Sequence, residues 1–214
     1  MSVKDRPPAK SLRDEHAEAT RAALIKTARE LFAARGYAEV SIDDISDGTR
    51  VTRGALYHHF ADKKDLFRAV FEEVQRELVA RVREAAEATA KKTAARSGPW
   101  TRLRRACHAY LDVCLDPRMQ QIVVRDASGV LGWHTWCELD RAYGLGVLEE
   151  ELARARDAGE LAPQSIGATA HLLLGTLNTA ATVVSQSHEP EVALAQVRGT
   201  IERLLLGLRK APRR

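Results

Sequence analysis

The amino-acid sequence predicts an all-α fold of about nine helices, and three observations support that prediction. Apolar residues recur at helical spacing along most of the chain, whereas the strict alternation typical of strands is almost absent. Alanine, leucine, arginine and glutamate are abundant, and aromatic residues make up only 5% of the 214 residues, a composition that favours helices over strands. Glycine and proline separate the periodic stretches, as expected between helices.

The first helix is predicted to follow a polar, proline-containing arm that covers residues 1–19. Ile25, Ala28 and Phe32 recur at intervals of three and four residues, which is the spacing of one helix face. Gly36 follows at a position where helices commonly end. We therefore expect this helix to end at about residue 35.

Two short helices are predicted next. Ser41 and Asp44 have the spacing of a capping box, which opens the first of them, and Gly48 is predicted to close it. Thr52 is a good N-cap for the second, which runs to Phe60. The sequence thus predicts a three-helix domain over residues 20–66.

A longer helix begins after Asp62 and is predicted to continue to the stop signal at 97–99. At roughly 30 residues it would be about 45 Å long, enough to join two domains. Five further helical segments follow in the larger domain, residues 67–214, and they are expected over 100–115, 118–127, 131–157, 164–187 and 190–208.

The two short helices are arranged as in a helix-turn-helix, and their chemistry suits DNA. Residues 48–61 contain no acidic side chain, and Lys63 and Lys64 follow them directly. Only Leu56 and Phe60 of the second short helix need burial, so its polar residues remain for a groove. Lys63 stands at the start of the long helix, where the helix dipole favours a phosphate.

The region from residue 25 to residue 71 resembles the DNA-binding domain of the tetracycline-repressor (TetR) family. The matching stretches are ARELF (28–32), GY (36–37), SIDDI (41–45), VTRGALYHHF (51–60) and KKDLF (63–67). The resemblance implies a homodimer that binds double-stranded DNA at a palindromic operator and is released by a small-molecule effector. The chain would then be a transcriptional regulator, most simply a repressor.

The resemblance also implies which side chains meet DNA. Arg53, Gly54, Tyr57 and His58 would face the groove, and Ser41, Tyr57 and Lys63 would contact phosphates. Arg50 stands where the family usually has a glycine in the left-handed conformation. A non-glycine residue in that conformation costs roughly 1 kcal/mol. The complete set of expected DNA-binding residues is Ser41, Arg50, Thr52, Arg53, Gly54, Tyr57, His58 and Lys63.

A ligand pocket is predicted in the larger domain, where wide aromatic side chains and a few polar groups interrupt an otherwise aliphatic composition. His171 and Asn178 are seven residues apart, so they share a helix face, and buried polar groups need partners. Those partners could be a ligand or neighbouring side chains. The candidates for an aromatic or lipophilic effector are Trp133, His171, Asn178, His108, Arg125, Trp136 and Tyr143.

The last helix carries apolar residues at alternating spacings of three and four, which is typical of a packing seam. These residues are Leu194, Val197, Ile201, Leu204 and Leu208. The helix before it is apolar nearly all round. The excess apolar surface favours a homodimer, and the TetR resemblance implies a four-helix bundle built from these two helices and their copies.

Several other classes of protein are disfavoured by the sequence. Three cysteines with no C-x-x-C pair indicate neither a disulfide framework nor a zinc site, and His58 and His59 point about 100° apart. We therefore expect no metal and no cofactor. The apolar stretch 166–184 is better explained as a buried helix than as a membrane span. A reducing, cytoplasmic location without membrane association fits best.

Two alternative functions remain at this stage. One is a DNA-binding helical protein that senses no ligand. The other is an all-α enzyme, against which the chain shows no nucleophile elbow, phosphate loop or zinc-protease motif. The net charge of +4 permits a polyanionic partner without requiring one.

Overall fold

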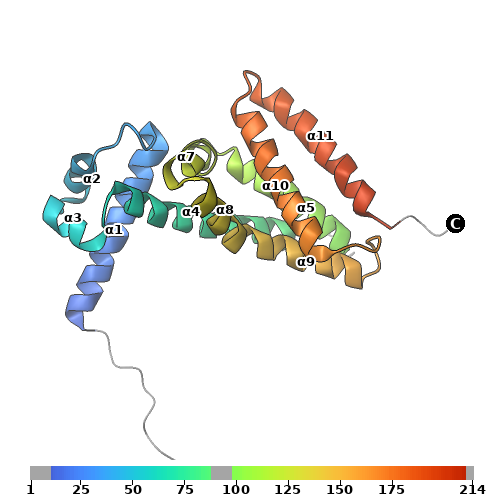
Figure 1. The fold of residues 1–214 in the computed structure, drawn as a ribbon, viewed down its shortest axis with the longest axis horizontal. Coiled ribbons are helices and arrows are strands. Elements are labelled where there is room, and N and C mark those ends of the chain that lie inside the picture. The colour runs from blue at the N-terminus through green and yellow to red at the C-terminus, as the bar shows by residue number, and fades with distance from the viewer. Residues whose placement is uncertain (1–10, 88–97, 211–214) are drawn as a thin grey trace, which may run out of the picture. The chain divides into compact units, whose positions relative to one another are not determined.

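The computed structural model of the protein describes residues 11–87 and 98–210. Within these ranges the chain forms nine continuous helical stretches and no strand, which confirms the all-α prediction. The chain divides into two compact units, Met1–Val70 and Phe71–Arg214 (Figure 1). Helix α4 (Lys63–Glu87) begins in the first unit and ends in the second.

The first unit consists of α1 (Leu12–Arg35), α2 (Ile42–Thr49), α3 (Arg53–His59) and the start of α4. A capping box between Ser11 and Asp14 opens α1, so residues 12–19 are helical rather than part of an arm. Phe32 and Phe67 meet edge to face, with ring centroids 5.4 Å apart. This aromatic contact lies in the core of the unit and fixes α1 against the start of α4.

The turn between α2 and α3 depends on a left-handed arginine. Arg50 has φ 57° and ψ 29°, so it occupies the left-handed conformation that glycine adopts most readily. The amide of Val51 donates to the Ser46 carbonyl at 3.1 Å across this turn, which satisfies a carbonyl at the helix end. Gly48 lies inside α2 instead of closing it, because the left-handed residue that ends the helix is Arg50. A Cβ at Gly48 would approach the Thr27 methyl group to 2.8 Å, so glycine serves close packing against α1 there.

The second unit contains the rest of α4 and the later helices of Figure 1. Their bounds are α5 Pro99–Cys114, α6 Pro117–Gln120, α7 Ala127–Leu131, α8 Trp133–Asp140, α9 Gly146–Asp157, α10 Ile166–Ser185 and α11 Pro190–Leu208. π-Helical segments at Gln121–Asp126 and Arg141–Leu145 join α6 to α7 and α8 to α9. Among the described residues, every helix is too short or too polar to span a bilayer.

Helix α5 packs against α9, α10 and α11, and these contacts form the core of the second unit. The Arg102 guanidinium donates two hydrogen bonds, of 3.0 and 2.9 Å, to the buried Glu151 carboxylate, which ties α5 to α9. A bidentate bond of this kind satisfies a carboxylate that would be costly to bury alone.

One predicted helix start was wrong, and two further predictions fall on residues that the structure does not describe. The helix expected to start at residue 131 starts at Trp133, because Gly132 has φ +85° and interrupts the helical path. The continuation of α4 toward residue 97 and the arm over residues 1–10 lie outside the described residues.

Candidate functional site

Helix α3 presents one polar face to solvent and one apolar face to the first unit. Leu56 and Phe60 are buried, as their spacing predicted, and they fix the rotation of the helix. The residues exposed on the opposite face are Arg53, Gly54, Tyr57 and His58. Gly54 has no atom within 4 Å of the position of a Cβ, so the backbone is open to a close approach there. The predicted groove-facing residues therefore share one accessible surface.

Arg53 is held loosely on this surface. Its Nη1 lies 3.4 Å from the Asp43 carboxylate, and both side chains are more than half exposed. Its Cζ also lies 5.8 Å from the centre of the Tyr57 ring. An exposed ion pair contributes little to stability, so a stronger partner such as a base edge can replace Asp43 at low cost.

Lys63 is less free than its place at a helix start suggested. Its Nζ donates to the carbonyl oxygens of Tyr37 at 2.8 Å and Val40 at 2.7 Å, and it lies 4.1 Å from the centre of the Tyr37 ring. Partial burial lowers the pKa of this ammonium group. A lysine ammonium has three protons, so one remains for a phosphate after both carbonyls are bonded.

The remaining predicted DNA contacts lie at helix termini. Ser41 and Thr52 are exposed N-caps of α2 and α3, and their hydroxyl oxygens accept from Asp44 N at 3.0 Å and Ala55 N at 3.2 Å. Hydrogen bonds from Ser41, with a smaller contribution from Arg35, lower the pKa of Asp44 to about 2. Asp44 therefore stays ionised and keeps the α2 capping box intact at neutral pH.

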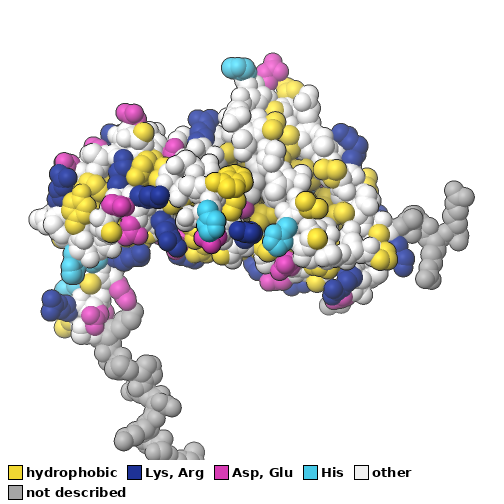
Figure 2. Space-filling view, viewed as in Figure 1, with side chains coloured by type: hydrophobic (Ala, Val, Ile, Leu, Met, Phe, Trp, Pro, Cys, Tyr) yellow, Lys and Arg dark blue, Asp and Glu magenta, His cyan; other side chains and the backbone are white. Residues whose placement is uncertain are grey.

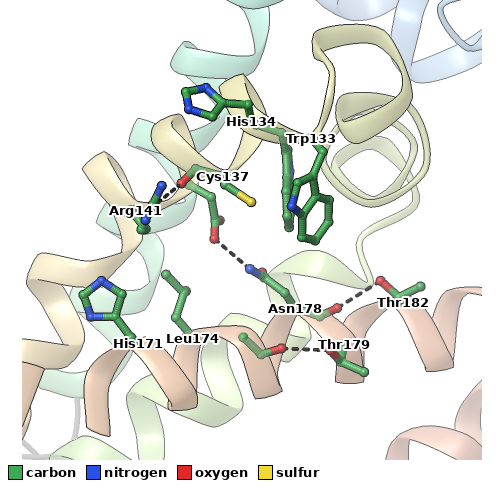
Figure 3. Close-up of a pocket in the computed structure, with 12 residues that line it drawn as sticks. Trp133, His134, Cys137, Arg141, His171, Leu174, Asn178, Thr179 and Thr182 are labelled. Carbon is green, nitrogen blue, oxygen red and sulfur yellow. Dashed lines mark hydrogen bonds between the residues drawn. The ribbon is translucent and has the colours of Figure 1, made fainter. Parts of the chain in front are cut away.

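A cavity of about 590 Å³ lies between α8 and α10 in the second unit (Figure 3). Predicted residues that line it are Trp133 and Trp136 from α8 and His171 and Asn178 from α10. The two indole rings lie 5.0 Å apart at 36°, and Trp133 is 70% exposed. The predicted aromatic and polar residues are thus brought together.

A second hollow, of about 550 Å³, shares Trp133, Trp136 and Asn178 with the first and adds Arg125. Two predicted ligand residues lie elsewhere. His108 Nε2 is 2.6 Å from Glu202, in an ion-pair cluster between α5 and α11, and Tyr143 lines neither hollow. A helical pattern assigns side chains to faces but cannot distinguish a cavity wall from a partly buried ion pair between two helices.

Sequence reasoning missed a buried carboxylate on the cavity wall. Asp140 is 6% exposed, and its Oδ2 accepts from the Asn178 amide at 2.7 Å. Its Oδ1 is 3.5 Å from the amide of Gln75, a buried residue of α4. The Tyr110 hydroxyl donates to the Asn178 oxygen. Burial raises the pKa of Asp140. Its position seven residues after Trp133, hence on the same helix face, was the available signal.

Helices α10 and α11 carry an apolar face on their outer side. A groove of about 740 Å³ follows the two helices, and Figure 2 shows hydrophobic side chains over them with few charged groups between. The exposed residues of the groove include Leu172, Val183 and Leu204, of which Leu204 is 52% exposed. Ile201 of the predicted seam is instead buried inside the chain, so it belongs to the core of the second unit.

Two family models match the chain. Residues 24–70 match the model of bacterial regulatory proteins of the tetR family, and residues 100–208 match the tetracyclin repressor-like C-terminal domain. The chain is 28% identical to the Transposon Tn10 TetC protein of Escherichia coli over 78% of this chain and 80% of that protein. It is 40% identical to the HTH-type transcriptional regulator AcrR of Shigella flexneri, over 27% of each chain.

Solved structures give the same result over nearly the full length. A TetR-family transcriptional regulator from Pectobacterium atrosepticum is 35% identical, with a TM-score of 0.80 over 95% of this chain and all of that one. RolR, solved in complex with resorcinol, has a TM-score of 0.66 at 18% identity over 88% of this chain and 90% of that one. At that identity the likeness concerns the fold alone.

Proposed function

We propose that this chain, a transcriptional regulator that belongs to the tetR family of bacterial regulatory proteins, is a homodimeric repressor released from a palindromic operator by a small-molecule effector. The observation that carries the proposal is the exposed polar face of α3, which lies opposite the buried Leu56 and Phe60. The family is one of transcriptional regulators and not of enzymes. One relative is a probable acrEF/envCD operon repressor of Escherichia coli (strain K12), 48% identical over 48 residues, or 22% of each chain.

In this proposal α3 enters the major groove, and its residues divide between bases and backbone. Arg53 reads the edge of a guanine, whose O6 and N7 accept two hydrogen bonds from a guanidinium. Thr52, Gly54 and His58 lie against the groove. Contacts to phosphates fix the position of α3 without reading the sequence. The residues proposed for these contacts are Ser41, Arg50, Tyr57 and Lys63, of which Tyr57 also faces the groove.

The test of the repressor proposal is selection of binding sites from a random pool of double-stranded DNA, followed by footprinting. One palindromic sequence should be enriched, with half-sites about 34–36 Å apart along the duplex, because each subunit reads one major groove. Recovery of unrelated sequences with equal affinity would instead indicate a DNA-compacting protein. Promoter fusions with and without the protein then distinguish repression from activation.

Replacing Lys63 by methionine should affect both stability and DNA binding. Loss of two hydrogen bonds to backbone carbonyls is expected to lower the free energy of unfolding by about 1–2 kcal/mol. Loss of a phosphate contact should weaken binding to all DNA sequences alike. It should also lower the slope of the logarithm of the binding constant against the logarithm of the salt concentration by about 1 per half-site. Chemical denaturation and binding at several salt concentrations measure the two effects.

Lys64→Met is the matched control for this prediction, because Lys64 is the exposed neighbour of Lys63 and carries the same charge. It should leave unfolding unchanged. A Lys63→Met variant with normal salt dependence but lower stability would restrict Lys63 to holding the loop at Tyr37 and Val40.

The proposed dimer is formed by the apolar face of α10 and α11. Leu194, Val197, Leu204 and Leu208 are the seam residues that remain partly or fully exposed on α11, and the groove beside them is lined by both helices. Because operators of this kind are read by two subunits, loss of the dimer should also abolish tight DNA binding.

Leu204→Asp is expected to raise the dimer dissociation constant at least about tenfold, since it places a charge in an apolar interface. Sedimentation equilibrium at micromolar concentration measures the change. Leu206→Asp is the control, because Leu206 is equally exposed on α11 but does not line the groove. A stable monomer in the unsubstituted protein would contradict the proposal.

The proposed effector site is the cavity between α8 and α10. Its size suits a drug-sized molecule, and such sites combine apolar walls with a few polar groups. Trp133, Trp136, His171 and Asn178 supply both, and Arg125 extends the site into the adjoining hollow. An aromatic or lipophilic molecule fits these walls best.

A further inference from the structure

The effector cavity contains an acidic group, Asp140, that forms no ion pair within the part of the chain that the structure describes. Asp140 lines the cavity, is 6% exposed, and has hydrogen bonds only to the amides of Asn178 and Gln75. In the part of the chain that the structure describes, no lysine, arginine or histidine nitrogen lies within 4.0 Å of its carboxylate. A buried carboxylate in this state is stabilised by any cation that reaches it.

The wall next to this carboxylate is aromatic. Trp133 and Trp136 stand on the same helix as Asp140, and their ring centroids are 5.0 Å apart. Trp133 is 70% exposed, an unusual state for the largest apolar side chain. Tryptophan faces are the best aromatic surfaces for a cation, and they also stack on planar rings.

The basic side chains around the cavity are engaged elsewhere. Arg141 Nε donates to the Cys137 carbonyl at 3.0 Å, and His171 Nδ1 lies 2.8 Å from the Gly167 carbonyl. Both lie on the side of the cavity away from Trp133 (Figure 3). His134 lies 3.4 Å from Glu138 at an exposed position. The Arg141 charge lowers the pKa of Asp140, but it does so from beyond 4.0 Å, and burial outweighs it.

We propose that the effector is an aromatic cation, with its planar ring system against Trp133 and Trp136 and its ammonium group at Asp140. This inference rests on the proposed function, since it gives the chemical class of the molecule that occupies the effector cavity. The ammonium group would bond Asp140 at Oδ1, whose 3.5 Å contact with Gln75 is long, while the shorter bond from Asn178 to Oδ2 is kept.

The experiment compares three probes that share one ring system and differ only in charge. They are 2-naphthylmethylammonium, 2-naphthylmethanol and 2-naphthoate, titrated calorimetrically into the full-length protein at pH 7.5. The ammonium compound should bind at least about tenfold more tightly than the alcohol, and the carboxylate most weakly. This comparison uses the unsubstituted protein and does not depend on any variant folding.

Asp140→Asn should then remove the advantage of the ammonium probe over the alcohol. Asp157→Asn, which changes an exposed carboxylate paired with Arg156, is the matched control and should preserve that advantage. Equal binding of all three probes, tightest binding of the carboxylate, or binding of none at millimolar concentration would overturn the inference.

The same protein samples are tested for operator binding without any probe. If the protein binds an operator but the affinities of the probes do not follow the expected order, the aromatic-cation inference is wrong and the repressor proposal stands. Failure to bind any palindromic DNA would reject the repressor, while the order of the probes would still report the chemistry of the cavity.

Discussion

Replacing Arg53 by alanine is expected to weaken operator binding by about 2–6 kcal/mol, at least a roughly 30-fold loss of affinity. One bidentate contact to a base contributes about 1–3 kcal/mol of discrimination, and a symmetric dimer makes it twice. The variant should also lose its preference at one base pair per half-site. Competition binding against a panel of singly substituted operators measures both effects.

The structure explains why most of that loss should appear as lost recognition. In the free protein the exposed Arg53 side chain contacts Tyr57 and forms an ion pair with Asp43. Its removal should therefore leave α3 folded, because the helix is held by Leu56, Phe60 and the Thr52 cap. Circular dichroism and thermal unfolding should match those of the unsubstituted protein.

Arg156→Ala is the matched control, since it removes the same charge from an exposed arginine paired with a neighbouring aspartate in the second unit. It should reduce DNA affinity only through the small change in net charge. Full affinity and unchanged sequence preference in Arg53→Ala would show that α3 is not the helix that reads the bases.

The helices could be predicted because helical periodicity and capping are local properties. Ser41 with Asp44 and the start of α11 at Pro190 were read from a few adjacent residues. Arg50 shows the limit of such rules, because the surrounding turn imposes the left-handed conformation that its residue type disfavours. Gly132 was overlooked as a break because a single glycine is also tolerated within a helix.

Site residues could be predicted only where the residue type by itself is unusual in its part of the sequence. Trp133, Trp136 and Asn178 drew attention as aromatic or polar groups in an aliphatic domain, and they line one cavity. Asp140 did not, because an aspartate at the end of a helix is ordinarily solvated. Its burial depends on Gln75, which is 65 residues away in the chain, and spacing within one helix cannot reveal such a contact.

Effector binding is expected to release the protein from its operator. Saturating effector should lower operator affinity about 5- to 150-fold, because coupling free energies between such sites are typically about 1–3 kcal/mol. By linkage, operator DNA should weaken effector binding by the same factor. Calorimetric titration of the effector with and without the selected operator, and of the operator with and without effector, measures both sides of the cycle.

Helix α4 is the element proposed to carry this coupling, since it is continuous from Lys63 in the DNA-binding unit to the side of the ligand cavity. Gln75 is the buried residue of α4 that contacts Asp140. An effector group that bonds Asp140 in place of Gln75 therefore removes this contact between α4 and α8. Gln75→Leu should therefore reduce the coupling while it changes effector-free operator affinity by less than about twofold. Gln121→Leu, on the π-helical segment before α7, is the control. It should leave the coupling between effector binding and operator binding unchanged. If an effector binds in the cavity with the same affinity whether or not operator is present, α4 has no signalling role. A ligand with equal affinity for the DNA-bound and the DNA-free state does not change the equilibrium between them.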